Sequence, residues 1–200
     1  MIEYGSTANF NTADLQTFFK QLNTAQVGET CGVAYGNNNG DVRGSVEANL
    51  DVQYIMATGQ FVNTTTYKIA EPGVGIEDQM LDYTYIVGNQ TEPALVHSIS
   101  YGEYGGDYDN VTDQRFNYEL QKMAARGITV LLASGDNGVG CDKQGTTQEY
   151  DYPSSPYITM VGATYVDTAT GVEVGATLSS GGFSKDFYRP SWQDSAVNGY

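Results

Sequence analysis

Apolar residues recur along this chain with the period of an α-helix in three stretches, residues 12–22, 76–87 and 110–126. In the first of these, Thr12 is the predicted N-cap. The apolar side chains that follow are spaced i, i+3, i+4 and i+7, which predicts one buried helical face made of Leu15, Phe18, Phe19 and Leu22. Gly127 supplies the stop for the third helix.

Short apolar runs separate the predicted helices. Residues 94–100, 128–133 and 157–161 are mostly apolar, which is typical of strands buried in a parallel sheet. Residues 164–178 predict a hairpin that turns at Ala169-Thr170-Gly171, and residues 28–44 predict a loop. The alternation of strands and helices predicts an α/β fold, with a mostly parallel sheet flanked by helices on both faces.

Residues 45–56 fit either a strand or a helix. Apolar and polar residues alternate from Val46 to Tyr54, as in a strand, but the segment is also rich in good helix formers. In both geometries Glu47 and Asp51 lie on a common face. Like charges that close cannot comfortably both ionise, so the pair is either a structural oddity or a device for acid–base chemistry.

Composition narrows the range of partners. The chain has 200 residues, 40% of them hydrophobic, which is enough for one domain or most of one. No apolar run approaches the ~20 residues needed to cross a membrane. The net charge of −15, from 24 acidic and 9 basic residues, argues against a nucleic-acid partner. It fits either simple solubility or service in an acidic medium.

Two cysteines and three sequons bear on the compartment. Cys31 and Cys141 could form one disulfide, and no Cys/His spacing indicates a metal site. Sequons for N-glycosylation begin at Asn63, Asn89 and Asn110. Together these features favour a secreted or lysosomal (vacuolar) route.

Candidate catalytic groups are mainly carboxylates. The only histidine, His97, lies in the middle of an apolar run, and we interpret it as a buried imidazole rather than the base of a Ser-His-Asp triad. The Glu47/Asp51 pair is then the candidate base of a hydrolase. Asp136 follows an apolar strand on a Gly-flanked turn. It is either a turn residue or, if protonated, a donor to a developing oxyanion.

Five ordered motifs resemble those of the sedolisins, the serine-carboxyl peptidases. The resemblance covers the chain from about residue 10 onwards, and it is carried by residues 47–54, 98–102, 133–138, 152–157 with 161–164, and 180–184. It implies a subtilisin-like fold and a helical conformation for residues 45–56. It also implies an endopeptidase or tripeptidyl peptidase that is active at acid pH on peptides or unfolded proteins.

The same resemblance implies a role for each matching residue. Glu47 would be the general base that takes the proton from a serine hydroxyl, Asp51 would orient Glu47 and share a proton with it, and Asp136 would stabilise the oxyanion. Two segments would flank the bound peptide as extra strands, namely Ser100-Tyr101-Gly102 and Ser180-Gly181-Gly182.

One family motif is missing. The nucleophile of the sedolisins lies in a Gly-Thr-Ser-x-Ser segment, which this sequence does not contain. By resemblance, that segment, the calcium ligands and a disulfide partner for Cys141 would follow Tyr200, whereas the pro-segment and the start of the mature domain would precede Met1. We therefore expect residues 1–200 to be a partial peptidase domain, inactive alone, whose partners are its pro-segment and the missing C-terminal segment. Two alternatives stay open, a non-catalytic relative that binds peptides or a partner chain, and a Ser-His hydrolase that uses His97.

Overall fold

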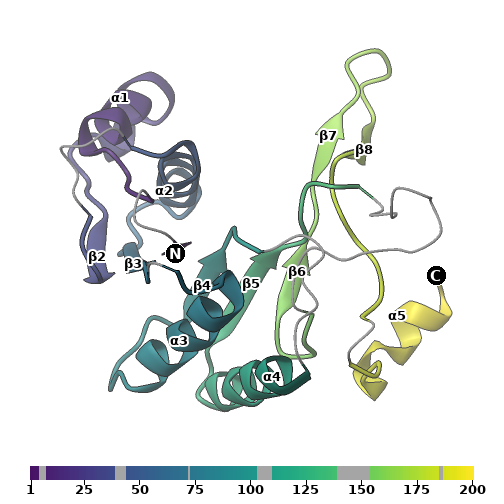
Figure 1. Cartoon of the computed structure of the whole chain (residues 1–200). Helices are drawn as coiled ribbons and strands as arrows, with labels where there is room; N and C mark the ends of the chain where they lie inside the picture. Colours follow the sequence, from purple (N-terminus) through teal and green to yellow (C-terminus); the bar gives the residue numbers. More distant parts are fainter. Residues whose placement is uncertain (5–7, 39–43, 72, 103–109, 139–153, 185–186) are drawn as a thin grey trace. The chain divides into compact units, whose positions relative to one another are not determined.

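The structure is a computed structural model that describes residues 1–4, 8–38, 44–71, 73–102, 110–138, 154–184 and 187–200 (Figure 1). The chain forms two compact units. The first comprises Met1–Gln79 together with His97–Ser100, and the second comprises Met80–Val96 together with Tyr101–Tyr200.

Parallel strands form the sheet of the first unit. They follow the order β2 (Gly32–Tyr35), β3 (Thr65–Ile69), β1 (Ile2–Tyr4) and β4 (Val96–Ile99), with β1 pairing in parallel with both β3 and β4. The prediction of a loop over residues 28–44 is therefore wrong where β2 runs. This strand is short, and three of its four side chains are exposed, so it lacks the apolar pattern of a buried strand.

Two helices pack against each other in this unit, α1 (Thr12–Leu22) and α2 (Val46–Thr58) (Figure 1). Their shared apolar cluster consists of Met1, Phe10, Leu15, Phe19, Ala48, Val52 and Met56. The predicted helix α1 is confirmed, but two details differ. Its N-cap is Asn11, whose side chain accepts a hydrogen bond from the Asp14 backbone N–H at 3.0 Å, and Leu22 is 69% exposed.

Residues 45–56, for which the alternation of apolar and polar residues left two structures open, form helix α2. The Ser45 hydroxyl caps its first turn by accepting from the Ala48 backbone N–H at 3.1 Å. The Gly59 N–H donates to the Ile55 carbonyl at 2.8 Å at the other end. The buried positions recur with helical period, because they are Ala48, Asp51, Val52 and Met56.

The second unit contains parallel strands and an antiparallel hairpin. Helix α3 (Ile76–Gly88) begins in the first unit and continues here, and α4 (Asn110–Ala125) precedes β5 (Thr129–Ala133). Strand β6 (Thr159–Val161) pairs in parallel with β5, and β7 (Thr164–Val166) pairs antiparallel with β8 (Glu173–Gly175). The chain ends in a 3₁₀ turn, Ser191–Gln193, and α5 (Asp194–Asn198).

Glycines end two of these elements as predicted. Gly127 follows α4 with φ +79°, and Gly171 turns the hairpin with φ +70°, where its N–H donates to the Asp167 carbonyl at 2.7 Å. The Arg126 guanidinium fastens the end of α4 to the end of α3, because it donates to the carbonyls of Gly88 at 2.9 Å and Gln90 at 2.7 Å.

The predicted α/β class with mostly parallel strands is confirmed by the pairings in both units. Within the described part of the chain, no helix is both long and apolar enough to span a membrane.

Candidate active site

Helix α2 carries the candidate acid–base pair of the first unit. Glu47 lies in its first turn and is half-buried, while Asp51, one turn further on, is only 8% exposed. The Asp51 Oδ2 atom is buried without a hydrogen-bond partner among the described residues. A buried carboxyl with an unused oxygen favours its protonated form, which is the state needed to share a proton with a neighbouring carboxylate.

The environment of Asp51 favours that state only in part. Burial raises the pKa of the Asp51 carboxyl, whereas a hydrogen bond from the Ser100 side chain opposes the rise. Ser100 follows β4 directly. The sequence motifs pointed to the backbone of Ser100 as a strand beside a substrate, and nothing in them indicated that its hydroxyl would contact Asp51.

His97 is fully buried in β4, at 0% exposure, and its ring centroid lies 5.6 Å from that of Tyr67 on β3. The prediction of a buried imidazole is confirmed. A base must reach solvent and a substrate, so this location gives no support to a hydrolase built on His97.

Asp136 lies in the second unit, in the loop that follows β5, and its side chain is exposed. The residues beside it are held by the segment that precedes the Gly181-Gly182 pair. The Ser180 N–H donates to the Gly135 carbonyl at 2.9 Å, and the Gly138 N–H donates to the Leu178 carbonyl at 2.7 Å. The structure therefore brings two of the motifs, residues 133–138 and 180–184, together.

The other residues predicted to bind substrate differ in their exposure. Gly181 and Gly182 are exposed, as expected for backbone offered to a peptide, and Tyr101 and Gly102 are half-buried. Residues 103–109, which follow directly, lie outside the described part. The binding roles of these segments remain predictions.

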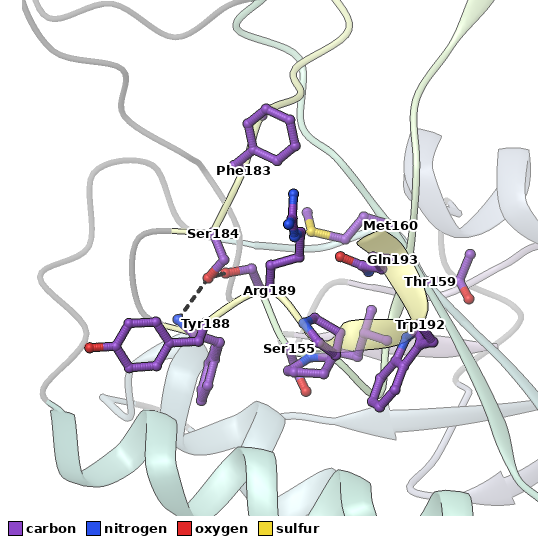
Figure 2. Close-up of a pocket in the computed structure, with 15 residues that line it drawn as sticks. Ser155, Thr159, Met160, Phe183, Ser184, Tyr188, Arg189, Trp192 and Gln193 are labelled. Atoms are coloured by element: carbon purple, nitrogen blue, oxygen red, sulfur yellow. Dashed lines mark hydrogen bonds between the residues drawn. The ribbon is translucent and has the colours of Figure 1, made fainter. Parts of the chain in front are cut away.

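A cavity of about 450 Å³ adjoins Gly182 in the second unit and was not predicted from the sequence. Its walls come from residues 154–156, 158–160, 182–184, 187–190, 192 and 193, and Figure 2 shows Phe183, Arg189 and Trp192 around it. The Arg189 guanidinium is bound by the Asp194 carboxylate at 2.9 Å, which links the cavity wall to α5. Residues 154–156 and 182–184 of its lining belong to two of the five sequence motifs, but those motifs gave no sign of a cavity.

Cys31 is the free cysteine of the described chain, and burial raises the pKa of its thiol to about 11. Cys141 lies outside the described residues, so the disulfide predictions stay open. No group of three or more His, Cys, Asp and Glu side chains in the described ranges could hold a metal ion.

Comparison with known proteins relates most of the chain to one kind of peptidase. Tripeptidyl-peptidase 1 of Bos taurus is 35% identical over 197 residues, 96% of this chain and 35% of that protein. Tripeptidyl-peptidase 1 of Homo sapiens is 34% identical over 193 residues, 94% of this chain and 34% of that protein. The chain thus spans about a third of the length of the curated relatives it matches. No protein-family model matches it.

Two solved structures share the fold. A Pseudomonas sedolisin, a serine-carboxyl proteinase complexed with two molecules of pseudo-iodotyrostatin, superimposes with a TM-score of 0.67 at 23% identity, over 99% of this chain and 60% of that one. A lanthipeptide protease gives a TM-score of 0.58 at 16% identity, over 90% of this chain and 51% of that one. The fold is thus sedolisin-like.

Both comparisons point to peptidases, because the relatives are tripeptidyl-peptidase 1 proteins and the two solved structures are proteases. The chain is thus similar over nearly all of its residues to tripeptidyl-peptidase 1, and its fold is similar to that of a sedolisin.

Proposed function

We propose that this chain supplies the acid–base half of an acid-active serine-carboxyl peptidase that hydrolyses peptide bonds. The observation that carries the proposal is the placement of Asp51, a buried carboxyl one helical turn from the more accessible Glu47. Tripeptidyl-peptidase 1 homology supports peptides as the substrate class.

In this proposal Glu47 is the general base. It accepts the proton of the attacking serine hydroxyl, and the Asp51 carboxyl holds a proton between the two side chains, which orients Glu47. A seryl nucleophile in a Gly-Thr-Ser-x-Ser segment would come from outside these 200 residues. If the complete protein lacks that serine, the alternative hypothesis applies, namely a non-catalytic relative that binds peptides.

In the same proposal, Asp136 donates a hydrogen bond to the oxyanion. Only the protonated carboxyl can donate a hydrogen bond, so the donor is present in acid and is lost as the carboxyl ionises. Both carboxylate roles therefore confine activity to low pH. This common requirement is the reason that an acidic compartment suits the complete enzyme.

Substitution of Glu47 and Asp136 in the complete protein tests the proposal. Glu47→Gln should abolish turnover, because glutamine cannot accept the proton. Asp136→Ala should lower kcat about 10²- to 10³-fold, the usual effect of one oxyanion donor. Rates are measured on a tripeptidyl and an internally cleaved reporter peptide at acid pH, with the exposed carboxylate variant Glu92→Gln as the control. Near-wild-type rates in either test variant would rule out these roles.

We further propose secretion or delivery to a lysosomal or vacuolar compartment, with N-linked glycans on the three sequons. Asn63 and Asn89 are exposed, and Asn110 begins α4. After expression through a secretory host, enzymatic removal of N-glycans should lower the mass, and Asn→Gln at each sequon should remove one step. A single unmodified species would contradict the assignment. We also propose, from the family resemblance, that the complete domain binds calcium through ligands outside these 200 residues.

A further inference from the structure

Ser180 bonds to the residues on both sides of Asp136. Its backbone N–H donates to the Gly135 carbonyl at 2.9 Å, and its hydroxyl oxygen accepts from the Asn137 backbone N–H at 3.0 Å. Ser180 itself is only 6% exposed. A buried hydroxyl is a poor candidate for direct substrate contact. Both hydrogen bonds of Ser180 described above are instead made with the loop that carries Asp136.

The contact between the loop and this segment is close. Gly138 adopts φ +66°, and a Cβ atom there would lie 2.8 Å from the Thr177 carbonyl oxygen. The Gly138 N–H donates to the Leu178 carbonyl at 2.7 Å. Asp136 is thus flanked on both sides by backbone that is fixed to residues 177–180, while its own side chain stays exposed.

We propose that Ser180 is a positioning residue that fixes the backbone around Asp136 and so aims its carboxyl at the oxyanion. The proposal rests on the function proposed for Asp136. An oxyanion donor is effective only if it is held at the position where charge develops. Movement of the loop should therefore lower kcat and leave substrate binding nearly unchanged. The hydroxyl is the part of this arrangement that a single side-chain change can remove.

The neighbouring Ser179 provides a matched control. Its hydroxyl oxygen accepts from the Ala163 N–H at 2.8 Å, in the loop after β6, and not from the loop that carries Asp136. Ser179→Ala and Ser180→Ala therefore each remove one hydroxyl acceptor at adjacent positions of one segment. The N–H groups that lose their acceptor, those of Ala163 and Asn137, belong to different loops. Ser180→Thr keeps the hydroxyl and serves as the conservative rescue.

Amide hydrogen exchange of the 200-residue chain tests the geometry without any assay of activity. Ser180→Ala should speed exchange at the Asn137 amide about fivefold, because that factor corresponds to the loss of one ordinary hydrogen bond. Ser179→Ala should leave Asn137 unchanged and speed exchange at Ala163. Unchanged exchange at Asn137 in the Ser180→Ala chain would overturn the proposal.

Kinetics of the complete enzyme test the consequence. Ser180→Ala should lower kcat about tenfold or more with KM nearly unchanged, Ser180→Thr should recover most of the rate, and Ser179→Ala should stay near wild type. In an Asp136→Ala background, Ser180→Ala should cost little more, because the group that it positions is gone. Equal losses in both backgrounds would overturn the positioning role. Full activity of Asp136→Ala alone would instead refute the function proposed for Asp136 and leave the exchange result standing.

Discussion

Asp51 shows how burial couples one residue to pH. Burial raises the pKa of its carboxyl above the ordinary value of 3.8, so between that value and the raised pKa the folded chain binds more protons than the unfolded chain. The contribution of Asp51 to stability therefore falls as pH rises through this window. Above the raised pKa, the ionised and buried Asp51 carboxylate destabilises the fold.

Asp51→Asn should remove this dependence. Because asparagine stays neutral, the variant should unfold at a higher temperature than wild type at pH 7, and the difference should shrink as pH is lowered toward 4. Thermal unfolding followed by circular dichroism at both pH values measures it. Parallel curves with a constant offset would contradict the linkage.

Asp167 gives a control of opposite sign. The Ala169 backbone N–H donates to its carboxylate at 2.8 Å, and this bond, with help from Thr170, lowers the pKa of Asp167. Its stabilising contribution is present at neutral pH and is lost as pH falls through the lowered pKa. The Asp167→Ala variant should therefore have a lower unfolding temperature than wild type at pH 7, and the two temperatures should converge in strong acid.

At the scale of the element, helix α2 depends on its N-cap because its first turn holds Glu47. Ser45→Ala removes the hydroxyl that accepts from the Ala48 N–H and should lower the free energy of unfolding by about 1 kcal/mol, as measured in urea. Thr17→Ala is the comparison. Its hydroxyl donates to the Ala13 carbonyl in the middle of α1, so the change should be close to neutral. A larger loss for Thr17→Ala than for Ser45→Ala would contradict the cap argument.

The elements with a strong apolar pattern were predictable from the sequence. The helical period located α1, α3 and α4, and the apolar runs located β4, β5 and β6. Strand β2 was not predictable because its side chains are mostly exposed and its pairing with β3 is supplied by the backbone. Period alone left α2 undecided, and only the family motif indicated a helix.

The candidate site divides in the same way. The motifs named Glu47, Asp51 and Asp136. They gave no sign that the Ser100 side chain would hydrogen-bond to Asp51, or that the Ser180 hydroxyl would accept from the Asn137 N–H beside Asp136. Such contacts join residues 49 and 43 positions apart. Spacing along the sequence carries no information about them.

At the scale of the whole molecule, 24 acidic residues against 9 basic ones leave a net charge of −15 at neutral pH. Their mutual repulsion opposes the compact state, and salt screens it. Raising sodium chloride from about 0.02 M to about 0.5 M should therefore raise the unfolding temperature at pH 7. Near the isoelectric point of about 4.1 the same salt should have little effect. An equal salt effect at both pH values would show that repulsion does not limit stability.

The high pKa of the Cys31 thiol makes this cysteine slow to react with thiol reagents. With a pKa of about 11, only about one Cys31 side chain in a thousand is a thiolate at pH 8, and the thiolate is the form that reacts. Rapid alkylation of the folded chain would therefore report on Cys141 alone. One fast-reacting thiol indicates that Cys141 is reduced, and none indicates that it is bonded or shielded. Native alkylation thus becomes a count of one cysteine in a protein that contains two.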